Sequence, residues 1–290
     1  MKTYNTAVIG CGMISKNHFK ALKNVQNARC VLACDNKPQR ARAAMELYGV
    51  PAMETDYRKV LENPDIDAVH ICLPHYLHAA VAIEALEHGK HVLCEKPMAL
   101  DPADAEAMIR ARDKSGKQLG ICLQNRYNES SRYMKELMDS GRMGRVIGGR
   151  GAVVWNRNPD YYTGSDWRGT LDKEGGSALE NQAVHTFDLL QWLTVPVRTL
   201  EASCSTTSAP MFPENIGNLN SGKWASSSLA PVPTAMCTTP RWNWRSSAKT
   251  AASGWWATWS PPNSTARHRP GISPPARCWA RITGAAATVS

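Results

Sequence analysis

Short apolar runs alternate with segments of helical periodicity along the first 124 residues. An apolar run at residues 6–9 precedes the glycine turn GCG, and the segment after it repeats apolar residues on one helical face. The alternation continues with predicted helices at 38–48, 75–87 and 102–114, and predicted strands at 30–34, 68–73, 91–93 and 119–123. Strands that alternate with helices favour an α/β fold with a doubly wound parallel sheet.

The first glycine turn is typical of a dinucleotide site. Gly10 and Gly12 permit a tight turn and a close backbone approach, and Ser15 takes the third small position. Met13 and Ile14 begin a predicted helix whose N-terminal N–H groups would face a pyrophosphate. The glycine pair alone is a weak signal, because a simple turn explains it equally well.

An acidic residue after the second predicted strand strengthens this interpretation. The carboxylate of Asp35 would accept hydrogen bonds from the adenosine ribose and repel a 2′-phosphate. The sequence therefore predicts NAD as the cofactor. NADP is less favoured but stays open, because Lys37 and Arg40 lie nearby.

Polar segments follow the strands at the edge where such a sheet binds its cofactor. Lys96, between Glu95 and Pro97, would face the cofactor and could orient a hydroxyl or carbonyl by hydrogen bonding and charge. The alternative is a solvated surface lysine.

Four ordered segments, GCGMISKNH, ICLPHYLH, HVLCEKPMAL and GGSALENQAVHTFDLLQWL, resemble the Gfo/Idh/MocA oxidoreductases over residues 1–214. The resemblance implies a Rossmann domain at residues 1–124 and an α+β substrate and oligomerisation domain, of which residues 125–215 are intact. It implies a nicotinamide cofactor, a sugar-like substrate and a homo-oligomer. The cofactor-binding residues predicted in this way are Gly10, Gly12, Met13, Ile14, Asp35, Leu73, Pro74, His78, Glu95 and Lys96.

The resemblance also predicts Lys96 and His185 as the catalytic residues. A histidine of near-neutral pKa can take the hydroxyl proton while hydride leaves the same carbon. Asn181 lies four residues before His185, on one face of a regular α-helix. The family often has aspartate there, and an amide cannot stabilise an imidazolium by charge. The alternative is a buried structural histidine.

Aromatic and arginine side chains between these motifs suit a polyhydroxylated ligand, although some of them will be core or surface residues. The substrate-binding candidates are Arg126, Trp155, Tyr162, Trp167, Arg168 and Asn181, with Tyr127, Arg157 and Tyr161 as further members of this group.

Composition changes abruptly near residue 216. All 25 acidic residues lie at or before Glu214, whereas eight of the 34 basic residues and seven of the ten tryptophans lie beyond it. The first 214 residues therefore carry 26 basic and 25 acidic residues, and the basic excess belongs to the tail. A basic, tryptophan-rich tail could bind nucleic acid or be a disordered extension.

A third hypothesis explains why acidic residues and tyrosines vanish together: residues 216–290 are translated out of frame. Over residues 241–260, an alternative frame permits LELEIxGENGSIRVVGDV, which is two strands around a glycine turn. The C-terminal domain of this chain would then be incomplete, which puts its oligomer in doubt.

The remaining composition favours a cytoplasmic protein. Nine cysteines without a C-x-x-C pair favour reduced thiols and neither a disulfide framework nor a metal site. The N-terminus does not match a signal peptide, and no apolar run is long enough to span a membrane. We therefore expect no membrane and no nucleic-acid partner.

These observations predict an oxidoreductase that transfers a hydride between a nicotinamide cofactor and a carbon of a sugar, cyclitol or sugar derivative. A catalytically silent nucleotide-binding regulator or an inactive truncated product are the alternatives, because a fold does not prove activity.

Overall fold

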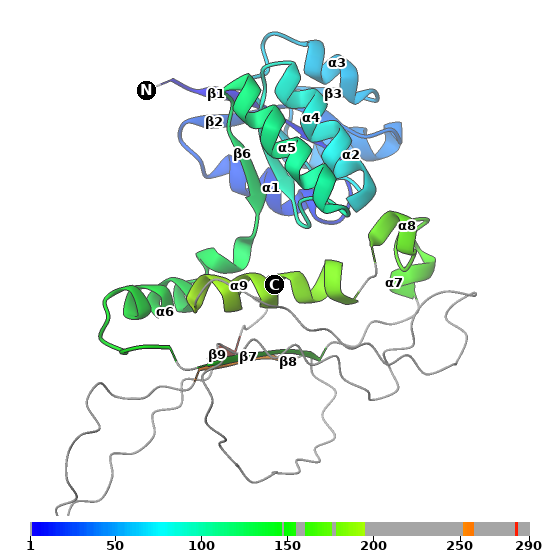
Figure 1. Ribbon diagram of the computed structural model, residues 1–290. Coiled ribbons are helices and arrows are strands. Elements are labelled where there is room, and N and C mark those ends of the chain that lie inside the picture. Colours follow the sequence, from blue (N-terminus) through cyan, green and yellow to red (C-terminus); the bar gives the residue numbers. More distant parts are fainter. Residues whose placement is uncertain are drawn as a thin grey trace, which may run out of the picture. The chain divides into compact units, whose positions relative to one another are not determined.

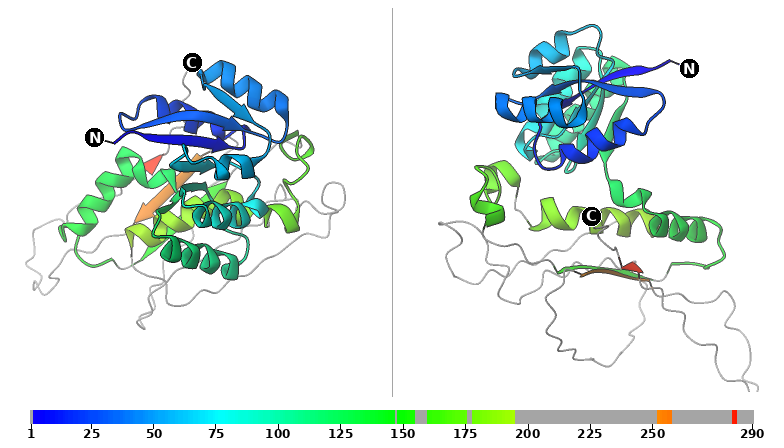
Figure 2. Two further views of the ribbon diagram at one scale, coloured as in Figure 1. Left: turned by 90° about the horizontal axis from the view of Figure 1, so that it is seen from above. Right: turned by 180° about the vertical axis from the view of Figure 1, so that it is seen from behind.

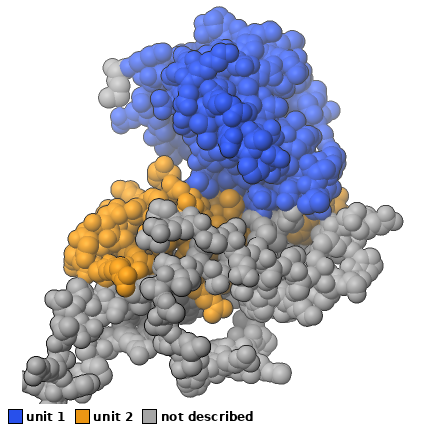
Figure 3. All heavy atoms as spheres, in the orientation of Figure 1, with its two compact units in different colours: residues 1–123, 165–181 blue, residues 124–164, 182–290 orange. Residues whose placement is uncertain are grey.

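The computed structural model describes residues 2–146, 148–154, 160–175, 178–194, 252–257 and 282–283. The chain forms two compact units (Figure 3). Unit 1 consists of Met1–Leu123 and Ser165–Asn181, and unit 2 of Gln124–Gly164 and Gln182–Ser290. The sequence did not predict that residues 165–181 return to the N-terminal unit.

Six parallel strands form the sheet of unit 1, in the order β3-β2-β1-β4-β5-β6 (Figure 1). This is the strand order of a Rossmann fold, in which ligands bind at the carboxyl ends of the strands. The strands are β1 (Tyr4–Ile9), β2 (Ala28–Cys34), β3 (Ala52–Glu54), β4 (Ala68–Ile71), β5 (His91–Glu95) and β6 (Leu119–Cys122).

Helices cover both faces of this sheet (Figure 2). The side chains of β1 alternate, so that Val8 packs into one apolar core while Ala7 and Ile9 pack into the other. Helices α1 (Ser15–Lys23) and α2 (Pro38–Tyr48) bury residues in the first core. The second core is covered by α3 (Tyr57–Glu62), α4 (His78–Glu87) and α5 (Pro102–Ser115).

The predicted α/β alternation is confirmed, with two additions and some shorter elements. The sequence missed β3 and α3 because a three-residue strand and a six-residue helix are too short for a clear period. A side-chain cap begins α3, since Asp56 accepts a hydrogen bond from the backbone N–H of Arg58 at 3.0 Å. The predicted helix 75–87 is a 3₁₀ turn, η1 (His75–Leu77), followed by α4.

The returning segment of unit 1 contains α8 (Leu171–Glu174) and the first part of η3 (Ala178–Ala183), a π-helix. Gly175 ends α8 with a φ of 85°, in the left-handed region that favours glycine. Its backbone is also crowded, because a Cβ there would lie 2.5 Å from Cδ2 of Leu100.

Unit 2 packs helices against a short antiparallel sheet (Figure 1). A Cβ on Gly149, the first residue of β7, would lie 2.8 Å from Cδ1 of Leu190, so α9 packs closely on this strand. The elements are η2 (Gln124–Tyr127), α6 (Glu129–Asp139), β7 (Gly149–Val154), α7 (Asp160–Thr163), α9 (Val184–Leu193), β8 (Ala252–Ala257) and β9 (Ile282–Thr283).

Part of the anomalous tail forms strands. Strand β8 pairs antiparallel with β7 from Gly149↔Ala257 to Val154↔Ala252, and β9 pairs with β8. The predicted poor order of region 216–290 stays a prediction. The other residues of the tail lie outside the described ranges.

Within the described ranges, no helix combines the length and the apolar composition that crossing a bilayer requires.

Candidate active site

Glycine occurs at positions 10 and 12 of unit 1 for different physical reasons. Gly10 has a φ of 93°, and a Cβ there would lie 2.4 Å from the carbonyl oxygen of Cys72. A Cβ on Gly12 would meet no protein atom within 4 Å. The fold therefore requires glycine at position 10, whereas the space beside Gly12 fits the close approach of a dinucleotide.

The glycine loop after β1 is held by side chains that form hydrogen bonds with its backbone. Ser15 donates to the carbonyl oxygen of Gly12 at 2.7 Å, which explains a serine at the third small position. The Asp35 carboxylate accepts from the backbone N–H groups of Cys11 at 2.8 Å and Lys37 at 2.9 Å. Because a carboxylate has about four acceptor positions, Asp35 can still accept from a ribose hydroxyl.

The other two predicted residues of this loop lie at its exposed end. Met13 is 67% exposed, and Ile14 immediately precedes α1. Helix α1 has no side-chain cap and no acidic residue in its first turn. Its N-terminal N–H groups are therefore suited to an anionic ligand.

His78, which the sequence predicts to line the cofactor site, is fully buried. Its side chain has no exposed surface. Its Nδ1 lies 2.7 Å from the carbonyl oxygen of Pro97, and its Nε2 lies 2.9 Å from that of Leu73. Burial lowers the pKa of His78, although these two carbonyl contacts oppose the shift. His78 therefore joins the loop after β4, which carries Leu73 and Pro74, to the loop after β5.

Lys96 is a half-buried lysine with a defined position. It follows β5, and its Nζ donates to the backbone oxygen of Asn181 at 2.7 Å and to Oδ1 of the same residue at 2.8 Å. The interpretation as a solvated surface lysine is therefore wrong. The predicted residues Lys96 and Asn181 come together although 85 positions separate them.

Behind Asn181 lies a carboxylate that the sequence did not single out. Glu174 has no exposed surface, and its oxygens accept hydrogen bonds from Nδ2 of Asn181 and from the backbone N–H of Gly169. The only sequence signal was its place directly before the GGS segment. An acidic residue at the end of a short helix is ordinarily a surface residue, so no pattern predicted its burial.

His75 and Trp167 pack beside Glu174. The Nδ1 of His75 lies 2.9 Å from the backbone oxygen of Glu174, and the rings of His75 and Trp167 have centroids 4.8 Å apart. The Arg168 guanidinium lies 5.2 Å from the Trp167 ring centroid. Burial lowers the pKa of His75 to about 4, with smaller contributions from the charges of Lys96 and Arg168. The ring is therefore neutral at pH 7.

A second buried cluster lies beside Lys96 at the ends of β5 and β6. The Nε2 of His18 lies 2.9 Å from Oε1 of Glu95, and the Nδ1 atoms of His18 and His70 are 3.0 Å apart. Burial alone would raise the pKa of Glu95, but the hydrogen bond and charge of His18 bring this pKa below its ordinary value. Glu95 also accepts from the backbone N–H of Lys96 at 3.3 Å. Glu95 therefore supports the loop that carries Lys96 from within the core.

Three residues of this cluster have ligand atoms that could surround a metal ion. The atoms of His18, Glu95 and Cys122 lie within 4.8 Å of one another. Burial and the Glu95 charge raise the pKa of Cys122 to about 12, which keeps its thiol protonated. Within this cluster, His18 and Glu95 are joined directly, with Nε2 of His18 2.9 Å from Oε1 of Glu95.

His185 is buried on α9 of unit 2, but the helix before it is not regular. Asn181 lies in the π-helix Ala178–Ala183, whose hydrogen bonds span five residues, while His185 lies in an α-helix. The prediction of an α-helical i, i+4 pair is therefore wrong in its geometry. The change of pattern can leave a backbone carbonyl available, and the carbonyl of Asn181 accepts from Lys96.

Two other candidates for substrate binding have partners within unit 2. Arg126 forms a two-pronged ion pair with Asp188 and stacks over Trp192, with 5.5 Å from its guanidinium carbon to the ring centroid. These contacts hold Arg126 against α9, and its role in substrate binding stays a prediction. Tyr162 packs edge-on against Tyr161. Trp155 and Arg157 lie outside the described residues.

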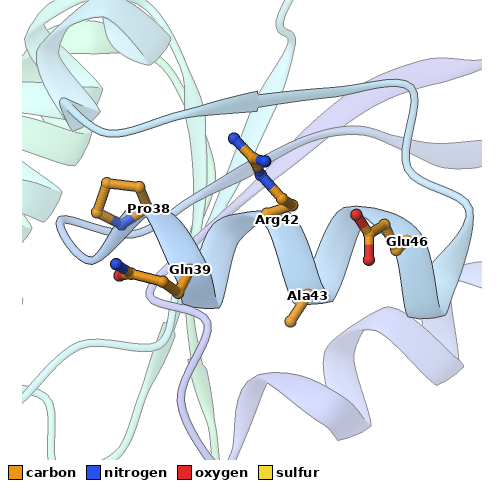
Figure 4. Close-up of a pocket in the computed structure, with 5 residues that line it drawn as sticks. All are labelled: Pro38, Gln39, Arg42, Ala43 and Glu46. Carbon is orange, nitrogen blue, oxygen red and sulfur yellow. The ribbon is translucent and has the colours of Figure 1, made fainter.

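A hollow of about 360 Å³ on unit 1 contains none of the predicted site residues. Figure 4 shows that all its lining side chains come from α2. They are Pro38, Gln39, Arg42, Ala43 and Glu46.

Comparisons with known proteins extend these observations. Residues 4–122 match the family model of the oxidoreductase family with an NAD-binding Rossmann fold, and residues 131–222 match that of the GFO/IDH/MocA C-terminal domain. The first match confirms the predicted NAD-binding Rossmann domain. The second match ends close to the point where the composition changes, and the frameshift hypothesis stays a prediction.

Named relatives are dehydrogenases. The chain is 30% identical over 194 residues to inositol 2-dehydrogenase of Salmonella paratyphi B, which covers 66% of this chain and 54% of that protein. It is 30% identical over 216 residues to levoglucosan dehydrogenase of Pseudarthrobacter phenanthrenivorans. This match covers 71% of this chain and 55% of that protein. The chain thus spans about half the length of the curated relatives it matches.

A solved structure supports the same fold. The WlbA dehydrogenase from Bordetella pertussis, in complex with NADH and UDP-GlcNAcA, is 35% identical, with a TM-score of 0.67. The similarity covers 71% of this chain and 64% of that one.

Proposed function

Because this chain belongs to the Gfo/Idh/MocA family of oxidoreductases, we propose that it transfers a hydride between NAD and a carbon of a sugar-like substrate. The substrate class is a sugar, a cyclitol or a sugar derivative. The names of the relatives support this class, since they include an inositol, a levoglucosan and a D-apiose dehydrogenase. The observation that carries the proposal is Lys96, whose ammonium is held at the end of β5 by Asn181.

The chain's own residues have separate roles in this reaction. Gly10, Gly12 and Asp35 hold the dinucleotide, and bound NAD supplies the hydride acceptor. Lys96 orients the reacting hydroxyl and stabilises negative charge on its oxygen through its ammonium. His185 takes the hydroxyl proton as hydride leaves the same carbon, and returns it in the reverse reaction.

We also propose a cytoplasmic setting, which the free thiols support. Six cysteines of the described residues are free, as expected for a protein of the cytoplasm. We also infer a homo-oligomer assembled through the C-terminal domain, as the family resemblance implies.

Cofactor binding and turnover together test this function. NADH and NADPH are titrated against the full chain, and NAD reduction is then followed with myo-inositol, levoglucosan, D-apiose and UDP-sugars. We expect tighter binding of NADH, because Asp35 repels a 2′-phosphate, and turnover of at least one compound. Binding without turnover would favour a nucleotide-binding regulator or an inactive product. Absence of binding, or tighter binding of NADPH, would contradict the cofactor assignment.

A further inference from the structure

Lys96, Asn181 and Glu174 form a directed chain of hydrogen bonds within unit 1. The Nζ of Lys96 donates to Oδ1 of Asn181 at 2.8 Å, and Nδ2 of Asn181 donates to Oε1 of Glu174. The two charged ends fix the orientation of the amide. A flipped amide would turn its NH₂ group to an ammonium and its oxygen to a carboxylate, and both contacts would be repulsive.

The burial of Glu174 calls for an explanation. A fully buried carboxylate is costly unless it is paired and hydrogen-bonded. Two N–H donors, from Asn181 and Gly169, satisfy its oxygens, and the Lys96 ammonium lies at the other side of the Asn181 amide. Successive hydrogen bonds polarise one another in a low-dielectric interior, so the charge of Glu174 acts on Lys96 through the amide.

We propose that Glu174 is a positioning residue that acts through Asn181 to hold Lys96 in place and keep it protonated. This inference rests on the proposed function, in which Lys96 contacts the substrate. A carboxylate at position 181 would place negative charge beside Lys96 directly. In this chain Asn181 takes that position. The negative charge lies on Glu174, which accepts a hydrogen bond from the Asn181 amide.

The same carboxylate organises a neighbouring loop. Its bond to the N–H of Gly169 fixes the chain directly after Trp167 and Arg168, and the Glu174 backbone oxygen meets His75. Glu174 thereby couples the position of Lys96 to that of an aromatic and basic segment suited to a sugar ring.

Other titratable groups also act on Lys96, and they differ in charge. His75, on η1, is neutral at pH 7 because burial lowers its pKa to about 4, and burial also lowers the pKa of His78. Cys122, at the end of β6, has a pKa raised to about 12 by burial and is uncharged. Among the described residues, Glu95, which is bonded to His18, and Glu174 are acidic groups joined by hydrogen bonds to Lys96 or to its partner Asn181.

Moving the charge by substitution tests the proposal. Glu174→Gln removes the charge and keeps the shape, whereas Asn181→Asp alone sets two carboxylates against each other. The double variant combines Glu174→Gln with Asn181→Asp, and its new carboxylate at position 181 would accept a hydrogen bond from Lys96. The new amide at position 174 would donate to that carboxylate and accept from the N–H of Gly169. Every hydrogen bond is then satisfied, and the negative charge has moved beside Lys96.

We expect Glu174→Gln to lower kcat by about tenfold or more while the Kd for NADH stays within about twofold. The alkaline limb of the kcat profile should move to lower pH, because Lys96 loses its proton more readily. The double variant should regain most of the rate and the original limb. The control is Glu84→Gln, which removes a half-buried carboxylate that accepts from the Tyr57 hydroxyl at 2.7 Å. This control should change neither kcat nor the pH of the alkaline limb.

A second readout needs no turnover. Trace acetylation at a series of pH values, with mass spectrometry of the peptide that contains Lys96, titrates this amine directly. Glu174→Gln should lower its pKa and the double variant should restore it. If this shift occurs while the unaltered chain turns over no substrate, the inference stands and the proposed function fails.

Other results overturn the inference. It is wrong if Glu174→Gln keeps both its rate and its Lys96 titration, or if the double variant is no better than Glu174→Gln. Should Glu174→Gln fail to fold, the double variant is compared with Asn181→Asp. A faster double variant supports the inference, and equal rates contradict it.

Discussion

At the scale of single residues, the glycine loop separates what the fold needs from what a ligand needs. Gly10 is required by its φ of 93° and by the carbonyl of Cys72, whereas Gly12 has open space beside it. The sequence motif predicts the same role for both glycines, because a pattern of small residues does not distinguish backbone strain from ligand contact. The structure explains Gly10 by its backbone conformation and Gly12 by the open space beside it.

We predict that Gly10→Ala and Gly12→Ala separate stability from binding. Gly10→Ala should lower the free energy of unfolding by about 1–3 kcal/mol or more, because it adds backbone strain and a steric clash. Gly12→Ala should leave stability nearly unchanged and weaken NADH binding. Urea unfolding and NADH titration of each variant measure the two effects.

A third glycine is the control for strain without a clash. Gly49 has a φ of 67°, and a Cβ there would meet nothing within 4 Å. Gly49→Ala should therefore destabilise less than Gly10→Ala and leave NADH binding intact. Equal NADH affinity in Gly12→Ala and the unaltered chain would contradict the role given to Gly12.

At the scale of elements, the contact between η1 and α8 contains a buried neutral histidine. The pKa of His75 is about 4 in the folded chain, against an ordinary value of 6.5. Below pH 6.5 the unfolded chain takes up a proton that folded His75 resists. The stability that this contact provides is complete above about pH 6.5 and is lost as the pH falls towards 4.

We therefore predict that acid weakens the fold partly through His75. The free energy of unfolding should fall between pH 7 and pH 4, by at most about 1.4 kcal/mol per pH unit from this residue. His75→Gln should show a shallower dependence. Urea unfolding at several pH values measures the slope, and an identical slope in both proteins would exclude His75 as a source.

Elements with a long, clear period were predictable, and elements defined by tertiary contacts were not. Helix α2 has the predicted bounds, because Pro38 begins it and Gly49 ends it with a left-handed cap. The π-helix around Asn181 is invisible to a period-based argument. Lys96 was predicted from its motif, whereas Glu174 was missed because its burial depends on segment 165–181 joining unit 1.

At the scale of the whole molecule, the tail bears on the hypothesis of a changed reading frame. The family match ends at residue 222, and acidic residues stop at Glu214. Strands β8 and β9 show that a chain of this composition still supplies strands to unit 2. Pairing of these strands does not distinguish the two frames, because backbone hydrogen bonds are common to all sequences.

We predict that the coding DNA has an open alternative frame through residues 223–260. Each codon of that frame begins at the third base of a codon in the frame that encodes this chain. Sequencing the DNA across this region, and upstream around residues 215–218, checks the prediction. A stop codon in that frame, such as TAA across Ala248 and Lys249, would exclude the hypothesis.

The chain is proposed to transfer a hydride from a sugar-like substrate to NAD, with Lys96 supporting the transfer. The most direct measurement supplies C-deuterated cyclitols and sugars with NAD, and follows deuterium into the nicotinamide ring by mass spectrometry. We predict deuterated NADH with the unaltered chain, and a rate lower by about two powers of ten in Lys96→Ala with NADH affinity little changed. Deuterium transfer at the same rate in Lys96→Ala, or none in a chain that binds NADH, would contradict this function.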